Sequence, residues 1–155
     1  MKLINYLRPE YIAIGLDVES KEDLLDAMVE LAGKNPLVKD KEKVSIAIHE
    51  RERIMSTGVG KGFAIPHGKT DAVGDIVLAF AVTKEPVDYA SMDNEPVRLV
   101  LLLLSRDSDV GSRLKLLSRA SKVMNSDAAR AALLAAKSPE EVMDIFTAEE
   151  ERIGE

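Results

Sequence analysis

One short stretch, residues 56–69, holds the side chains best suited to chemistry. It reads STGVGKGFAIPHGK and carries two hydroxyl residues, three alternating glycines and a histidine. That histidine, His67, is one of two in the chain, which has no cysteine. Imidazole titrates near neutral pH and can act as a base, a metal ligand or a nucleophile toward phosphorus. His67 is therefore the first candidate for a catalytic group.

The residues before His67 are candidate donors for an anion. Glycines adopt positive φ angles readily, which lets successive amide N–H groups face one anion. The donors that we select are Ser56, Thr57, Gly58 and Gly60. The GxGxG spacing after a predicted helix fits neither a Walker A loop nor a dinucleotide-binding loop. The alternative is a turn that binds nothing.

Helical periodicity places a cation close to this stretch. A helix is predicted over residues 41–54, and at about 100° per residue Arg51 falls in the middle of its inward stripe. The members of that stripe are Val44, Ala47, Ile48, Ile54 and Met55. The same projection sends His49 and Glu52 toward solvent, and we interpret His49 as a residue without a role. The inward guanidinium needs a partner, either a structural carboxylate or an anion at His67.

Predicted strands and helices alternate along the chain. Strands are predicted over residues 11–16, at a sheet edge, and over the apolar runs 76–82 and 97–104. Helices are predicted from the N-caps Ser20, Asp40 and Ser138, and over residues 112–124 and 127–137. Continuously apolar strands are typical of sheets covered on both faces. The sequence therefore predicts an α/β fold with helices on both sides of the sheet.

Composition excludes several classes of function. The chain has 155 residues, a net charge of −6 and 4% aromatic residues, without a basic face for nucleic acid. The absence of cysteine and of a second inward histidine argues against a metal site. No signal peptide or membrane-spanning run is apparent, so we expect no membrane insertion and a cytoplasmic location. The length is that of one domain, residues 1–155.

Arg51 and the segments STGVGKG, AIPHGK and MDNEPV form a pattern that resembles a known family. It is that of the enzyme IIA domains of the phosphoenolpyruvate-dependent phosphotransferase system, of the fructose/mannitol type, which includes the nitrogen-regulatory IIA proteins. The similarity runs from LINYLRPEYI to SPEEVMDIF, which is nearly the whole chain. It implies a three-layer α/β/α sandwich with a mixed central sheet.

The resemblance also implies roles for individual residues. His67 corresponds to the phospho-accepting histidine, which receives its phosphoryl group from phospho-HPr or the nitrogen-branch counterpart of HPr. Arg51 corresponds to the arginine that supports the active site. The four loop residues Ser56, Thr57, Gly58 and Gly60 correspond to the phosphate-binding loop. No cofactor is implied, and the chain is expected to be a phosphocarrier and not a free-standing turnover enzyme.

One position departs from the family pattern. Family members commonly carry a second histidine in an H-L-x-x-L setting, whereas residues 113–117 read RLKLL. Arg113 would either hold the phosphoryl oxygens bidentately or impair onward transfer to a IIB domain. A solvated residue at a helix start is the third reading.

Two downstream roles follow. In the first, the protein is a regulator that binds target proteins according to its phosphorylation state, which Arg113 and MDNEPV favour. In the second, it is a sugar-uptake component that passes phosphate to a IIB domain for fructose- or mannitol-type substrates. A hydrolase or a metal enzyme is the more distant alternative.

Overall fold

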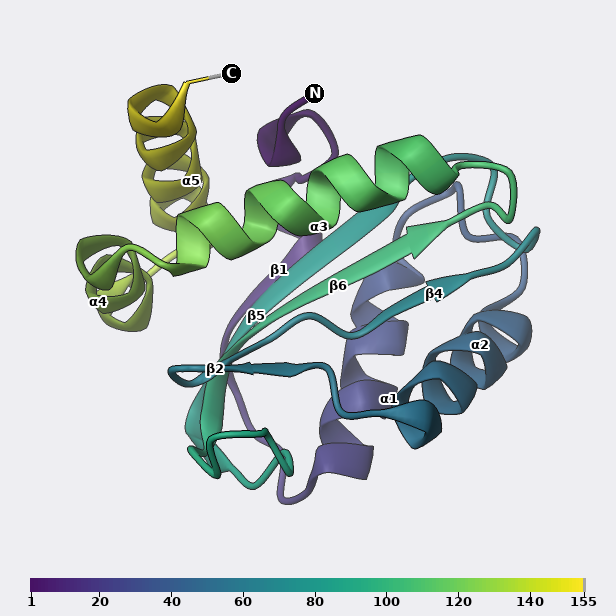
Figure 1. The fold of residues 1–155 in the computed structure, drawn as a ribbon, viewed down its shortest axis with the longest axis horizontal. Coiled ribbons are helices and arrows are strands. Elements are labelled where there is room, and N and C mark those ends of the chain that lie inside the picture. The colour runs from purple at the N-terminus through teal and green to yellow at the C-terminus, as the bar shows by residue number, and fades with distance from the viewer. Residues whose placement is uncertain (155) are drawn as a thin grey trace.

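The computed structural model describes residues 1–154, in which helices and strands alternate (Figure 1). The elements are η1 (Leu3–Asn5), η2 (Pro9–Tyr11), β1 (Ile12–Leu16), α1 (Lys21–Ala32), α2 (Lys41–Ile54), β2 (Gly58–Gly60), β3 (Phe63–Ala64), β4 (His67–Lys69), β5 (Val77–Val87), β6 (Val97–Ser105), α3 (Val110–Met124), α4 (Asp127–Ala135) and α5 (Pro139–Ile153). No helix in this part of the chain is long and apolar enough to cross a membrane.

The strands form one mixed sheet. The order is β1-β5-β6-β3-β2, with β4 also paired to β6. Strand β1 is parallel to β5, and β3 and β4 are parallel to β6. The central pair β5 and β6 is antiparallel, as is the hairpin of β2 and β3. The mixed sheet and the edge position of β1 are both as predicted.

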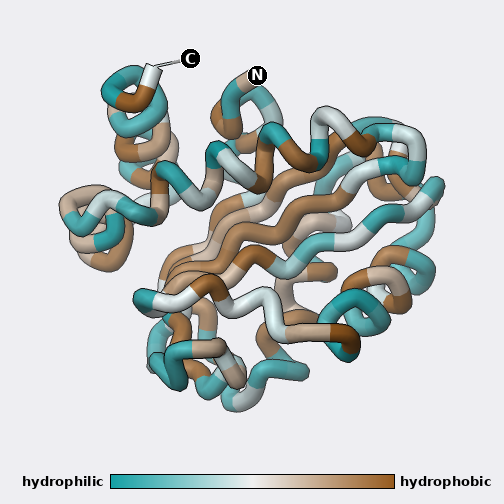
Figure 2. The backbone as a smooth tube through the Cα atoms, viewed as in Figure 1, coloured by the Kyte–Doolittle hydropathy of each residue, from teal (hydrophilic) through white to brown (hydrophobic). Residues whose placement is uncertain are grey.

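Helices cover both faces of the sheet, which confirms the three-layer sandwich. Helices α1 and α2 lie on one face, and α3, α4 and α5 lie on the other (Figure 1). Neighbouring residues of β5 point to opposite layers, so Leu78 and Phe80 pack with Phe146 while Val77 and Ala79 pack with the α1 and α2 side. The brown, apolar strands lie between the helices in Figure 2. This double burial explains the continuous apolar runs.

Polar caps fix where three helices begin. The Ser20 hydroxyl accepts a hydrogen bond from the amide of Asp23, and the Asp40 carboxylate accepts from two amides of the first turn of α2. The Ser138 hydroxyl does the same for Glu141. Each side chain satisfies amides that have no partner within the helix. The predicted starts of α1, α2 and α5 are therefore confirmed.

The glycine-rich stretch folds differently from the predicted loop. Residues 58–69 contain three short strands, and β2 turns into β3 through Gly60, Lys61 and Gly62, which all have positive φ angles. Two of these positions are glycines because that conformation is costly for other residues. Gly58 is needed for a different reason, since an added Cβ would lie 2.1 Å from the Ser91 hydroxyl oxygen. The glycines thus build a hairpin.

Candidate active site

His67 is the first residue of β4 and opens into a cleft of about 370 Å³. Its strand pairs with β6, and the backbone of Gly68 lies close to Ala47 on α2, where an added Cβ would be 3.3 Å from the carbonyl carbon. The cleft is lined by Ala47, Glu50, Arg51, Ile54, His67, Gly68, Lys69 and Arg113. The imidazole therefore lies between the end of α2 and the first turns of α3.

One hydrogen bond fixes the protonation pattern of the His67 ring. Nδ1 lies 2.8 Å from the carbonyl oxygen of Ile65. A carbonyl only accepts, so the proton of the neutral ring is on Nδ1. Nε2 then keeps its lone pair, and it has no hydrogen-bond partner within residues 1–154. The geometry thus presents Nε2 as the nucleophilic atom.

The surroundings keep this ring neutral. Burial lowers the pKa of His67 most strongly, and the cations of Arg51 and Arg113 lower it further. The bond to Ile65 and the charge of Glu52 oppose that shift without reversing it. Since the ordinary pKa of histidine is about 6.5, His67 is mostly unprotonated at pH 7. A neutral imidazole is the form that can attack phosphorus.

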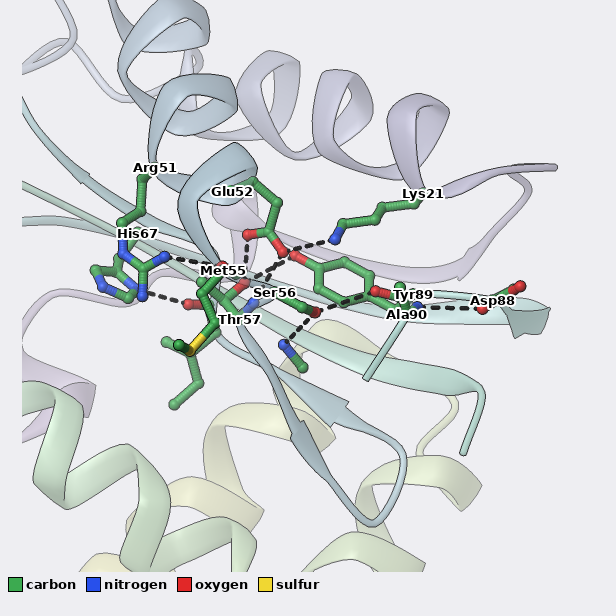
Figure 3. Close-up of polar contacts among 12 residues, drawn as sticks. Lys21, Arg51, Glu52, Met55, Ser56, Thr57, His67, Asp88, Tyr89 and Ala90 are labelled. Carbon is green, nitrogen blue, oxygen red and sulfur yellow. Dashed lines mark hydrogen bonds and ion pairs between the residues drawn. The ribbon is translucent and has the colours of Figure 1, made fainter. Parts of the chain in front are cut away.

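Arg51 comes from the last turn of α2 and its guanidinium lies beside the imidazole (Figure 3). Nη1 donates to the carbonyl oxygen of Met55 at 2.9 Å, which satisfies a carbonyl at the end of the helix. A guanidinium has five N–H donors, so this bond anchors the group and leaves donors for the cleft. Arg51 therefore faces inward, as the projection predicted.

Arg113 enters the cleft from α3. Its Nη1 donates to the Ser105 hydroxyl at 2.8 Å, where β6 ends. The residue is half-buried and lines the cleft together with His67. The solvated position considered from the sequence does not match this geometry. Two guanidiniums, from α2 and α3, therefore border the same imidazole.

The donors of the glycine hairpin are used elsewhere. Their hydrogen bonds run from Thr57 N to Glu52 Oε1 at 2.8 Å, from Gly58 N to Ser56 Oγ at 3.1 Å, from Lys61 N to Asp93 Oδ2 at 2.9 Å and from Ser56 Oγ to Tyr89 O at 3.1 Å. None of Ser56, Thr57, Gly58 and Gly60 lines the cleft of His67. The expectation that these amides face one anion beside His67 does not fit this geometry, because the segment pairs as a hairpin.

A buried polar cluster next to the cleft was missed from the sequence. Glu52, predicted to face solvent, is 8% exposed. Oε1 accepts from Thr57 N and from Lys21 Nζ, both at 2.8 Å, and Oε2 accepts from Thr57 Oγ1 at 2.6 Å. Tyr89 completes the cluster, with its hydroxyl 3.0 Å from Thr57 Oγ1 and its ring 4.4 Å below the Lys21 ammonium (Figure 3). The available signal was that Glu52 follows buried Ile48 by one helical turn.

His49, Ile54 and the residue after the helix, Met55, also correct the projection. His49 is half-buried, and its Nε2 lies 2.9 Å from Asp26 Oδ1 on α1, so the prediction of a solvent-facing side chain was wrong. Ile54 and Met55 were predicted to be inward, yet they are 80% and 59% exposed. The helix ends at Ile54 and Met55 is extended, so helical periodicity no longer applies there.

The family follows from the sequence match. Residues 5–149 match the family described as "Phosphoenolpyruvate-dependent sugar phosphotransferase system, EIIA 2". The chain belongs to this family, and the resemblance inferred from its motifs is confirmed. It is an EIIA component of the phosphotransferase system, and its relatives include both fructose-specific and nitrogen-regulatory proteins.

Similar sequences come from both branches of the family. The fructose-specific EIIA component of Haloferax volcanii is 34% identical over 88% of this chain and 89% of its own length. The nitrogen regulatory protein of Escherichia coli K12 is 34% identical over 95% of this chain and 90% of its own. The fructose-specific EIIABC component of Bacillus subtilis is 34% identical as well, but the chain spans 23% of its length.

Solved structures confirm the fold. The nitrogen regulatory protein IIA-Ntr of Neisseria meningitidis superposes with a TM-score of 0.86 at 31% identity, covering 93% of this chain and 98% of that one. The mannitol enzyme IIA of Escherichia coli, in its complex with phosphorylated mannitol enzyme IIB, superposes with a TM-score of 0.80 at 21% identity. The match covers 92% of this chain and 97% of that one. The second likeness is one of fold alone.

Proposed function

We propose that the chain is a phosphocarrier that accepts a phosphoryl group on Nε2 of His67 and regulates partner proteins according to its phosphorylation state. The donor is a phosphohistidine on HPr or on its nitrogen-branch counterpart. The observation that carries the proposal is the His67 ring itself. Its Nδ1 is tied to Ile65, its pKa is lowered, and its Nε2 opens into a cleft between two guanidiniums.

The transfer is a single in-line displacement. The Nε2 lone pair of His67 forms the new bond to phosphorus, and the bond from phosphorus to the donor nitrogen breaks, returning its electron pair to the donor imidazole. The proton stays on Nδ1, hydrogen-bonded to the Ile65 carbonyl, so the ring of phosphorylated His67 carries a positive charge beside the anionic phosphoryl oxygens. Arg51 and Arg113 neutralise charge on the equatorial phosphoryl oxygens, which is the main requirement of such a transition state.

The hairpin residues support the site indirectly. Ser56, Thr57 and Gly58 use donors within this segment or toward Glu52 and Tyr89, and Gly60 lies at the turn of the hairpin. We assign them the role of holding the chain that leads to His67 and not of binding phosphate. The phosphoryl oxygens are then bound by side chains of the cleft.

The rim of the cleft suits a protein donor. Ile54, which lines the cleft, is an exposed apolar residue at the end of α2. Further exposed apolar side chains lie next to it in the chain and at the start of α3; they are Met55, Val110 and Leu114. Exposed apolar side chains gathered at one place are typical of protein interfaces. A phosphoryl group would add about −1.5 to −2 charges to this rim. That change would alter the affinity for a docked partner, and it gives the carrier a regulatory output.

Sugar uptake is the alternative role, and the fructose-specific relatives favour it. In that role a IIB domain would take the phosphoryl group onward. Arg113 favours the regulator, because it stands where the family pattern has a histidine and lies in the cleft. The proposal therefore predicts that Arg113→His increases transfer to a IIB cysteine. If the wild type already transfers at the rate of that variant, uptake becomes the better reading.

The direct experiment is a phosphorylation assay with phosphoenolpyruvate, enzyme I and the donor carrier. The wild type is expected to gain one phosphate that is labile in acid and stable in base, and His67→Ala is expected to gain none. An unphosphorylated wild type with active donor carrier would overturn the proposal.

A further inference from the structure

A continuous series of hydrogen bonds connects the buried Glu52 cluster with the imidazole. Glu52 accepts from Thr57 N and Oγ1. The carbonyl oxygen of Thr57 accepts from the amide of Ile65 at 3.0 Å. The carbonyl oxygen of Ile65 then accepts from Nδ1 of His67 at 2.8 Å. Ile65, which sets the His67 tautomer, is thus held in place by Thr57, which is itself held by Glu52.

The cluster is built to hold one geometry. Three donors converge on the Glu52 carboxylate, two from Thr57 and one from Lys21. A buried carboxylate is stable only when it is paired and hydrogen-bonded, so any displacement of Thr57 would be costly. Tyr89 closes the far side, since its hydroxyl meets Thr57 Oγ1 and its ring contacts the Lys21 ammonium.

We propose that Glu52 is a positioning residue for His67. By fixing Thr57, it fixes the backbone of Ile65, whose carbonyl keeps the proton on Nδ1 and leaves Nε2 free. Glu52 touches no reacting atom, because its carboxylate lies outside the residues that line the cleft (Figure 3). This inference rests on the proposed function for its purpose, but the tautomer that it concerns exists without any phosphoryl donor.

Glu52→Gln is the most informative substitution. Glutamine keeps the size of the side chain but replaces one acceptor oxygen by an NH2 donor. In place of Oε1 the new NH2 would face the Thr57 amide and the Lys21 ammonium, and in place of Oε2 it would force the Thr57 hydroxyl to turn its proton toward Tyr89. In both cases Lys21 loses its charged partner. We expect the ratio of Nδ1-protonated to Nε2-protonated neutral His67 to fall about five- to tenfold, the factor for roughly one lost hydrogen bond.

The measurement is 15N NMR of the imidazole nitrogens above the His67 pKa, without a donor present. The chain contains one other histidine, so His49 provides an internal reference. The matched control is Asp26→Asn, which alters the carboxylate beside His49 and should leave His67 unchanged. An unchanged His67 tautomer in folded Glu52→Gln would overturn the proposal, and equal changes in both histidines would show a general structural effect instead.

A second pair of variants covers the case in which Glu52→Gln does not fold. Thr57→Val keeps the volume but loses the Oγ1 bond, while Thr57→Ser restores the hydroxyl. Valine should shift the His67 tautomer and slow phosphorylation by up to about tenfold, the factor for one lost hydrogen bond, without changing the KM for the donor carrier, and serine should rescue both. A tautomer that is the same in both variants contradicts the proposal. A tautomer shift in a chain that is never phosphorylated would leave this inference standing and reject the proposed function.

Discussion

Two polar clusters begin at adjacent residues of α2 and have opposite character. Arg51 points into the cleft of His67, where its guanidinium donates one hydrogen bond to the Met55 carbonyl and keeps other donors free. Glu52 points into the cluster of Thr57 and Lys21, where both of its oxygens are occupied. Buried polar groups that are fully paired hold a structure, whereas groups that are left unpaired are available for a ligand. We call the first the open cluster (Arg51 and His67) and the second the closed cluster (Glu52, Thr57 and Lys21). The comparison assigns chemistry to the open cluster and positioning to the closed one.

The largest effect is expected from the imidazole. His67→Ala should abolish phosphorylation, because the attacking nitrogen is removed. Its thermal stability should stay close to that of the wild type, since the ring borders an open cleft. His49→Ala is the control and should retain phosphorylation, measured as incorporation of labelled phosphate. Phosphate on His67→Ala would place the acceptor elsewhere.

The next largest effect on phosphorylation is expected from Arg51, the cation of the open cluster. Arg51→Met should slow phosphorylation about a hundredfold, because one charged donor to the phosphoryl oxygens is lost. Arg53→Met, an exposed arginine two residues along α2, should not change the rate. Rapid-quench kinetics at saturating donor would measure both. Equal rates for the two variants would remove Arg51 from the mechanism.

A substitution in the closed cluster should lower the free energy of unfolding. Glu52→Ala leaves the amide and hydroxyl of Thr57 without their acceptor, and we expect a loss of about 2–3 kcal/mol in the free energy of unfolding. Glu30→Ala removes a carboxylate whose pair with Lys41 is exposed, and it should cost under about 0.5 kcal/mol. Urea unfolding compares the two. A similar, small loss in both variants would mean that the Glu52 cluster contributes little to the stability of the fold.

Protonation of His67 gives a smaller, graded effect. Its pKa is lowered by burial first and by the two arginines after that. The neutral form reacts, so the phosphorylation rate should remain near its maximum at pH 7 and fall only at a pH below the ordinary pKa of about 6.5. An NMR titration of the ring should give a midpoint below that value. A midpoint at or above it would contradict the assigned environment.

The smallest effect is expected for Arg113, the second arginine of the cleft, and it concerns the pKa of His67. Arg113→Met removes the last of the causes that lower the pKa of His67, so the midpoint should rise slightly. A lower midpoint in Arg113→Met would show that the guanidinium does not face His67.

The open cluster was more accessible to sequence reasoning than the closed one. His67 and Arg51 were predicted because a lone imidazole, a family motif and helical periodicity each concern one segment. The caps at Ser20, Asp40 and Ser138 are likewise local, and all three were confirmed. Local signals of this kind also gave β1, β6 and the first part of β5, but neither the extension of β5 to Val87 nor the short strands β2, β3 and β4.

The closed cluster depends on contacts between segments far apart in the chain. Glu52 meets Lys21 and, through Thr57, Tyr89, so its burial is decided by tertiary packing and not by its own helix. The hairpin was missed for a related reason, since Gly58 is required by the approach of Ser91. Arg113 was recognised as a departure from the family pattern, but its bond to Ser105 requires the end of β6 beside α3.

Combined 31P and 15N NMR of the phosphorylated protein would identify the nitrogen that bonds to phosphorus. With Nδ1 tied to Ile65, phosphorus should couple to Nε2 of His67 while Nδ1 keeps its proton. Coupling to Nδ1, or to no nitrogen of His67, would contradict the assigned geometry of the site.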